Sequence, residues 1–190
     1  ADEGCRTLVT GEMGIGNTTP STALLCAYLG LAPHDVAGAG TGLDKQGIAH
    51  KADVVARGLA ANKNAVEAKE PLAILACLGG LEIATLAGLI IGGAARSLLV
   101  VVDGFISTAA YVAAEHFCPF VRDYAFFSHV SAEQGHRDVV ESLGRKPLLS
   151  LGLRLGEGTG GALALPLLRA ACDMFNNMAT FSGAGVSREA

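Results

Sequence analysis

Two glycine-rich segments each carry a glutamate, and each could bind an anion next to an acid–base group. The first, residues 11–18 with the sequence GEMGIGNT, has the glycine spacing of a phosphate-binding P-loop. Asn17 stands where that loop requires a lysine, and Glu12 adds a negative charge. A glycine turn before a helix still offers free N–H groups and the positive end of the helix dipole. Without the lysine, these groups suit a monophosphate better than ATP.

The second segment, residues 154–161 with the sequence RLGEGTGG, holds Glu157 among glycines. Both loops also have a purely structural interpretation: the glycines of the first could only allow a tight turn, and Glu157 could only cap a helix. Two acidic loops in one domain favour a shared cleft, because carboxylates that face a pocket usually have a chemical task. Glu12 and Glu157 are therefore the candidate acid–base residues.

A third carboxylate, Asp103, follows the apolar run LLVVV and precedes Gly104. The end of a strand before a glycine turn is a common ligand-binding position in α/β sheets, so Asp103 is a candidate to contact a ligand or to fix the loop. The histidines are less informative. None has the spacing of a metal site, and we expect His136, on a predicted helix, to be structural.

Strands and helices must position these loops. A β-prone run at residues 6–10 leads into the first loop, and a helix over residues 18–29 follows, with Gly30 at its end. Asp44 can cap a helix that runs to about residue 62. Residues 63–71 are predicted to be a charged surface link. Further helices are expected over residues 71–78, 81–95, 132–143 and 162–178, and further strands within residues 97–106, 122–130 and 148–155.

The alternation of short apolar strands and helices predicts an α/β fold, with a mostly parallel, Rossmann-like sheet flanked by helices in three layers. We expect a single nucleotide-binding and catalytic domain over residues 1–190. Ligands bind such sheets at the carboxyl ends of the strands. Glu12, Asp103 and Glu157 each follow an expected strand, so the fold predicts that the three carboxylates meet at one edge of the sheet.

Charge and hydropathy exclude two classes of partner. The formal net charge is -4 and there is no lysine- or arginine-rich run, so nucleic acid is not an expected partner. The most apolar region, residues 71–114, is interrupted by Glu82, Arg96 and Asp103. These charges leave no uncharged stretch of the roughly 20 residues that a spanning helix needs, so we do not expect a membrane protein.

Cysteine usage and the first residues indicate the compartment. Five cysteines are scattered without a C-x-x-C pair, which is typical of thiols in a reducing cytoplasm and not of a disulfide framework or a zinc site. The N-terminal sequence ADEGCR is acidic and polar, unlike a secretory signal. We therefore expect a cytoplasmic protein.

Several long motifs together resemble one enzyme family. The segments TGEMGIGNTT, GTGLD, VDGFI, SAEQGHR and LGLRLGEGTGGALALPLLRAA are similar, in order and spacing, to the nicotinate-nucleotide–dimethylbenzimidazole phosphoribosyltransferases of cobalamin lower-ligand assembly. The resemblance covers nearly the whole sequence but only the C-terminal part of that family. The N-terminal segment of the family, which helps to form the benzimidazole pocket, is expected to be missing here.

The resemblance implies a reaction that the residues can support. Phosphoribose passes from nicotinate mononucleotide to dimethylbenzimidazole, which gives α-ribazole 5′-phosphate and nicotinate. The pyridinium nitrogen of the donor is already cationic, so nicotinate leaves without protonation. The benzimidazole must lose its N–H, so one general base is the main requirement. A second carboxylate can stabilise oxocarbenium-like charge. The family also implies a homodimer, with no cofactor and no metal.

Site residues follow from the same resemblance. It implies that Glu157 is the general base and Glu12 the other active-site acid. Lys51 matches a lysine near the phosphate, although a lone helix lysine often only reaches for water. Asp103 would contact the ribose or hold the loop. The residues implied to bind the substrate or its phosphate are Gly14, Gly16, Asn17, Thr18, Lys51, Gly156, Gly158 and Asp103.

Two other functions remain open from the sequence. A non-catalytic or weakly active nucleotide-binding fragment of such an enzyme would keep the phosphate loop but lack the acceptor pocket. A degenerate P-loop NTPase would share the glycine spacing, but no magnesium-binding acid follows a second strand of the required type.

Overall fold

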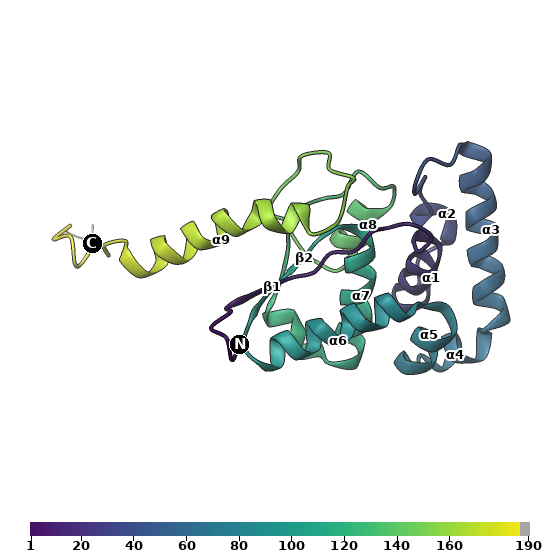
Figure 1. The fold of residues 1–190 in the computed structure, drawn as a ribbon, viewed down its shortest axis with the longest axis horizontal. Helices are drawn as coiled ribbons and strands as arrows, with labels where there is room; N and C mark the ends of the chain where they lie inside the picture. The colour runs from purple at the N-terminus through teal and green to yellow at the C-terminus, as the bar shows by residue number, and fades with distance from the viewer. Residues whose placement is uncertain (187–190) are drawn as a thin grey trace.

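The computed structural model describes residues 1–186 and has an α/β fold, as the sequence predicts (Figure 1). Three parallel strands, β1 (Thr7–Val9), β2 (Leu99–Val102) and β3 (Ala125–Phe127), form a sheet in the order β1-β2-β3. The helices are α1 (Thr18–Leu29), α2 (Pro33–Val36), α3 (Lys45–Ala61), α4 (Lys63–Ala68), α5 (Pro71–Leu78), α6 (Leu81–Ala95), α7 (Gly104–Phe117), α8 (His136–Ser142) and α9 (Thr159–Asn177), with a 3-10 turn at Pro119–Asp123.

Helices lie on both faces of the sheet. A methyl group added to Gly93 of α6 would contact Leu8 and Val100 at 3.0 and 3.2 Å, so these alternate side chains face α6. The opposite face meets the start of α9, where a methyl group on Gly161 would lie 2.3 Å from Val9. The rest of α9 projects away from the body (Figure 1), so this face of the sheet is only partly covered.

The hydrophobic core lies between the sheet and the helices α1, α6 and α7. Helix α7 is buried from Gly104 to Ala114, because it packs against both α1 and α6. Leu24 and Leu25 of α1 and Ile90 of α6 are fully buried beside it. This core fixes the position of the loops that follow β1 and β2, since each loop leads directly into one of these helices.

Local signals placed several helix ends correctly. Helix α1 spans the expected residues and ends at Gly30, whose φ of 70° is the left-handed conformation that terminates helices. The carboxylate of Asp44 accepts a hydrogen bond of 2.8 Å from the Gly47 N–H and caps α3 as expected. The helices expected over residues 71–78 and 81–95 are present with the same bounds.

Three expectations for secondary structure were wrong. Residues 63–71 contain the short helix α4. Residues 148–155 form no strand: Leu149 makes one isolated parallel bridge with His129, and Gly152, at a φ of 66°, turns the chain away. Helix α8 begins only at His136, because Gly135 before it has a φ of 76° and interrupts the helix.

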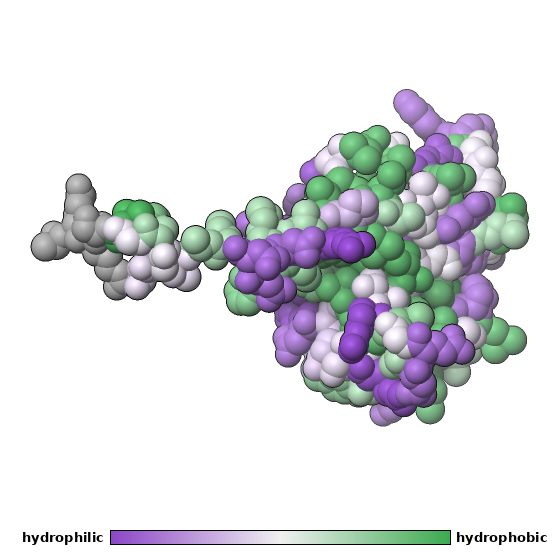
Figure 2. Space-filling view, turned by 60° about the vertical axis from the view of Figure 1, so that its left-hand side comes forward, coloured by the Kyte–Doolittle hydropathy of each residue, from purple (hydrophilic) through white to green (hydrophobic). Residues whose placement is uncertain are grey.

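Apolar side chains remain exposed along the projecting part of the chain. Figure 2 shows hydrophobic surface, in green, on the body and on this C-terminal segment. Phe175 is 89% exposed. Other exposed apolar residues in the same region are Leu163, Leu167, Met174, Met178 and Phe181. Within residues 1–186, no helix combines the length and the hydropathy that crossing a membrane would require.

Candidate active site

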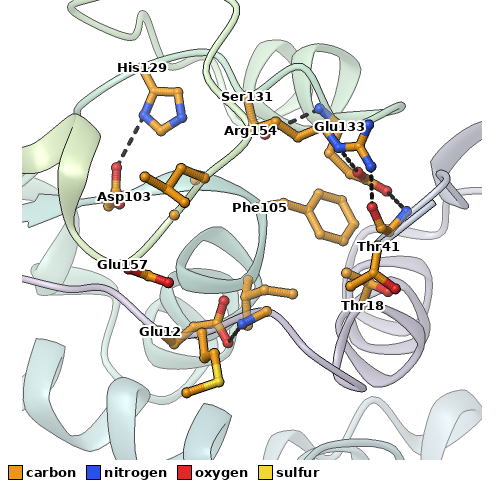
Figure 3. Close-up of a pocket in the computed structure, with 17 residues that line it drawn as sticks. Glu12, Thr18, Thr41, Asp103, Phe105, His129, Ser131, Glu133, Arg154 and Glu157 are labelled. Carbon is orange, nitrogen blue, oxygen red and sulfur yellow. Dashed lines mark hydrogen bonds and ion pairs between the residues drawn. The ribbon is translucent and has the colours of Figure 1, made fainter.

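A cavity of about 310 Å³ lies where the three strands end (Figure 3). Its walls come from five segments far apart in the sequence: the loop after β1 with the start of α1, residues 40–41 between α2 and α3, the start of α7 after β2, the loop after β3, and residues 154–157. This is the edge at which parallel α/β sheets bind ligands. The residues predicted from the sequence that line it are Glu12, Gly14, Thr18, Asp103, Gly156 and Glu157.

Glu12 is held by its own loop. Its Oε2 atom accepts hydrogen bonds of 2.7 Å from the Gly14 N–H and from Nδ2 of Asn17. The same Asn17 amide lies 3.4 Å from a carboxylate oxygen of Glu82. Asn17, at the position of the P-loop lysine, is buried and binds two carboxylates, so it orients Glu12 and does not line the cavity.

Glu157 projects from an unusual backbone. Gly156, Glu157 and Gly158 have φ values of 76°, 60° and 81°, so three successive residues are in the left-handed region. Glycine adopts this conformation without strain, whereas glutamate does not. The Glu157 N–H donates a hydrogen bond of 3.0 Å to the carbonyl oxygen of Glu12. The glycines therefore allow a tight curl that presents an exposed Glu157 carboxylate beside the Glu12 loop.

The two glutamates also border a second space. A groove of about 670 Å³ lies on the other side of this loop pair, and Glu12, Met13 and Glu157 line both the cavity and the groove. Val9, Ala162 and Leu165 give the groove an apolar wall. Gly158 lines the groove and not the cavity. Both carboxylates thus stand at the boundary between a cavity with mixed polar and apolar walls and a more apolar groove.

Asp103 lies in the back of the cavity with its side chain 0% exposed. Its Oδ1 atom lies 3.1 Å from each of Nδ1 of His129, Oγ of Ser128 and the backbone nitrogen of Gly161. Burial raises the pKa of Asp103, but the hydrogen bonds from His129 and Ser128 together outweigh it and hold the pKa below its usual value. Oδ2 is buried and has no hydrogen-bond partner among the described residues, and Asp103 is one of the residues that line the cavity.

Lys51 is buried behind the cavity. Its ammonium group donates hydrogen bonds of 2.8 Å to Oγ1 of Thr18 and 3.0 Å to the carbonyl oxygen of Gly38. Burial lowers the pKa of Lys51, and the charge of Glu133 opposes that shift. The alternative of a solvated helix lysine is therefore wrong. Lys51 places a cation directly behind Thr18, at the start of α1. Gly16, another predicted phosphate-binding residue, is exposed and does not line the cavity.

The sequence of the chain matches a known family along its length. A family model described as a phosphoribosyltransferase matches residues 1–186. The chain belongs to this phosphoribosyltransferase family.

Individual relatives of the chain carry a more specific name. Proteins named nicotinate-nucleotide–dimethylbenzimidazole phosphoribosyltransferase are 64% identical in Solidesulfovibrio magneticus and 62% identical in Nitratidesulfovibrio vulgaris, each over 98% of this chain. A crystal structure of CobT from Thermus thermophilus superposes with a TM-score of 0.87 at 46% identity, over 99% of this chain and 55% of that one. The chain spans about half the length of these relatives, 53% and 52% for the first two.

Two charged residues that line the cavity were not predicted. Oε1 of Glu133 accepts a hydrogen bond of 2.7 Å from the Gly40 N–H, and the Arg154 guanidinium donates to the Gly40 carbonyl oxygen. Nε of Arg154 lies 3.8 Å from Oε2 of Glu133. Both side chains line the cavity, as His129 does. Their only signal in the sequence was their position inside SAEQGHR and LRLGEGTG.

His136 has a structural position in the fold. It is 0% exposed, and its Nδ1 atom accepts a hydrogen bond of 2.8 Å from the Ser131 N–H. Because a backbone N–H can only donate, the ring proton must be on Nε2, which lies 2.9 Å from Oγ1 of Thr108. The Thr108 hydroxyl in turn donates to the Gly104 carbonyl oxygen at 2.7 Å. Neutral His136 thereby joins the loop after β3 to the start of α7.

Proposed function

We propose that the protein carrying this chain transfers phosphoribose from nicotinate mononucleotide to a dimethylbenzimidazole-type base, giving α-ribazole 5′-phosphate and nicotinate. One observation carries the proposal: Glu12 and Glu157 stand together between a cavity that holds several charged side chains and a more apolar groove. A transferase needs its acid–base groups at the place where two substrates meet. The names of relatives at 64% and 62% identity agree with this reaction.

The cavity and the groove differ in polarity, as the nucleotide donor and the benzimidazole acceptor do. The nucleotide donor is charged and hydroxylated, which suits the cavity with Asp103, Arg154 and Thr18 in its walls. The benzimidazole is a flat apolar ring, which suits the groove beside Val9 and Leu165. In this arrangement the ribose anomeric carbon lies at the boundary, with nicotinate departing into the cavity and the acceptor nitrogen approaching from the groove.

Glu157 acts as the general base in this proposal. As one nitrogen of the benzimidazole forms the new bond to the anomeric carbon, the bond to nicotinate breaks and its electron pair returns to the pyridine ring. The proton on the other benzimidazole nitrogen passes to the Glu157 carboxylate. Glu12, held by Gly14 and Asn17, keeps its negative charge near the ribose and stabilises oxocarbenium-like charge. We propose that no metal and no cofactor take part.

Turnover and binding measured together test the proposal. Incubation of the full natural protein with nicotinate mononucleotide and dimethylbenzimidazole should yield α-ribazole 5′-phosphate, and calorimetry should detect binding of the nucleotide. The chain covers only 53% of the length of its relative, which favours a second candidate, a nucleotide-binding fragment without useful catalysis. Binding without product would support that second function and contradict the first.

We propose that the phosphate of the donor binds at residues 14–18, at the start of α1 and in front of Lys51. The N-terminal N–H groups of α1 and the buried ammonium group favour a phosphate there. Lys51→Met should lower the affinity for nicotinate mononucleotide by about tenfold, because a hydrogen bond to a charged group contributes about 1.5–3 kcal/mol. Calorimetry measures this change. Lys45→Met, an exposed position on the same helix, is the matched control and should bind normally. Equal affinities in all three proteins would contradict the phosphate position.

We propose that Oδ2 of Asp103 accepts a hydrogen bond from a ribose hydroxyl, because it is the buried unpartnered carboxylate oxygen on the cavity wall. A nucleotide lacking that hydroxyl, tested as its 2′-deoxy and 3′-deoxy forms, should bind about tenfold more weakly than nicotinate mononucleotide. In Asp103→Asn, nicotinate mononucleotide and its deoxy forms should bind with nearly the same affinity. If removal of the hydroxyl weakened binding equally in the unchanged protein and in Asp103→Asn, the contact would be contradicted.

We also propose that the protein is a cytoplasmic homodimer. The exposed apolar residues of α9 support a dimer, since large exposed apolar patches usually mark contact sites. The scattered free cysteines support a reducing compartment. Sedimentation equilibrium of the full natural protein measures the first property, and a monomer at micromolar concentration would contradict it.

A further inference from the structure

Gly11 and Gly158 approach each other more closely than any side chain would allow. A methyl group added to Gly11 would lie 2.3 Å from the nitrogen of Gly158 and 2.8 Å from the carbonyl carbon of Glu157. These are backbone atoms, which cannot rotate aside as the end of a side chain can. Gly11 is not among the residues with positive φ, so its backbone conformation does not require glycine. It is the close approach of the two loops that requires it.

This contact lies next to both candidate acid–base residues. Gly11 precedes Glu12, and Gly158 follows Glu157. On the other side of the contact, the Glu157 N–H donates to the Glu12 carbonyl oxygen at 3.0 Å. A methyl group on Gly156 would lie only 3.3 Å from that same oxygen. The two loops are therefore joined through backbone atoms on either side of the carboxylates.

We infer that Gly11 and Gly158 form a glycine clasp whose task is to fix Glu157 relative to Glu12. The clasp residues are positioning residues: they touch the two catalytic loops and have no side chain that could touch a substrate. A backbone contact cannot change rotamer, so it sets the separation of the two backbone segments that carry the glutamates more rigidly than packed side chains would. The inference rests on the proposed function for its catalytic consequence, but the contact itself can be measured without the reaction.

Gly11→Ala tests the clasp. The new methyl group must move from 2.3 Å to an ordinary contact of at least 3.4 Å, so the two loops must separate by about 1 Å. A misplacement of about 1 Å can lower a rate by roughly a hundredfold, and we expect kcat to fall by that factor. The KM for nicotinate mononucleotide should change by less than about threefold, because Thr18 and Lys51 belong to α1 and α3.

Two further alanine variants serve as controls. Gly88 lies on the exposed side of α6 with nothing within 4 Å of an added methyl group, so Gly88→Ala should behave as the unchanged protein. Gly93→Ala pushes against Leu8 and Val100 at 3.0 and 3.2 Å and disturbs the contact of α6 with the sheet, but it does not touch the Glu12–Glu157 backbone contact. It reports what a general loss of packing does to kcat.

Hydrogen exchange of the Glu157 amide gives a readout that needs no reaction. This amide should be protected at least about tenfold in the unchanged full natural protein, and Gly11→Ala should lose the protection while Gly88→Ala keeps it. Free exchange in the unchanged protein would overturn the clasp even if the variant fails to fold. A normal kcat in Gly11→Ala, or a fall no larger than that of Gly93→Ala, would also overturn it. Loss of protection in a protein that never turns over would support the clasp and count against the proposed function instead.

Discussion

Replacing Glu157 with glutamine is expected to lower kcat by about 10²–10⁴-fold, the usual range for a positioned general base. Nicotinate leaves without protonation, so binding of the donor does not need the base. The acceptor N–H is lost only as the new bond forms, so the transition state does need it. The affinity for nicotinate mononucleotide should therefore stay within about threefold of the unchanged value, since interactions made only in the transition state affect kcat. Steady-state kinetics and calorimetry on Glu157→Gln in the full natural protein measure both quantities.

Glu12→Gln provides the comparison for this experiment. Glutamine at position 12 keeps an oxygen that can accept from Gly14 and Asn17, so the loop should keep its shape. Its loss of kcat should be smaller than that of Glu157→Gln, and the double variant should lose less than the product of the two effects, because the residues act in one step. A near-normal kcat in Glu157→Gln would assign the base to another residue, with Glu12 the first to consider.

Acidification is expected to destabilise the fold by about 3 kcal/mol between pH 6.5 and pH 4, through His136. Burial lowers the pKa of His136 from 6.5 to about 4. In the unfolded chain this histidine takes up its proton near pH 6.5, whereas in the folded protein it stays neutral until about pH 4. The contribution to stability is therefore complete above pH 6.5 and is lost as the pH falls toward 4. The corresponding change in the folding equilibrium is about 150-fold.

Urea denaturation at pH 7 and at pH 4.5 measures this effect. His136→Gln cannot titrate and should show a clearly smaller difference between the two pH values. His50→Gln, at an exposed position on α3, is the matched control and should behave as the unchanged protein. Asp103 titrates below this window, because its pKa is held under its usual value, and it should not interfere. An equal pH dependence in all three proteins would show that His136 does not carry the effect.

The sequence predicted those parts of the fold that local chemistry decides. Gly30 ends α1 and Asp44 caps α3 because each signal acts within a few residues. The strand expected over residues 148–155 did not form, since apolar residues alone do not determine whether a neighbouring strand is in reach. In that segment Leu149 forms a single β-bridge with His129, and the left-handed conformation of Gly152 then turns the chain away. Tertiary contact, and not propensity, decided that segment.

The candidate site divides in the same way. Glu12 and Asp103 follow strands, and strands in a parallel sheet end at one edge, so their meeting could be predicted. The roles of Glu133 and Arg154 could not, because both depend on Gly40, which lies far from them in the chain. Asn17 was predicted to bind phosphate from its place in a P-loop-like sequence. That stays a prediction, and its amide also binds Glu12 and Glu82, a contact that spacing alone does not reveal.

The order of the strands has a consequence for how the protein folds. Pairing of β2 with β3 joins residues 100 and 125, whereas pairing of β1 with β2 joins residues 7 and 99. Closing the longer loop costs about 1 kcal/mol more in chain entropy, and such long-range contacts form late. We therefore expect β1 to dock last during folding and to detach first during local opening. Because Glu12 follows β1 directly, the acidic pair would be completed only in the final step of assembly.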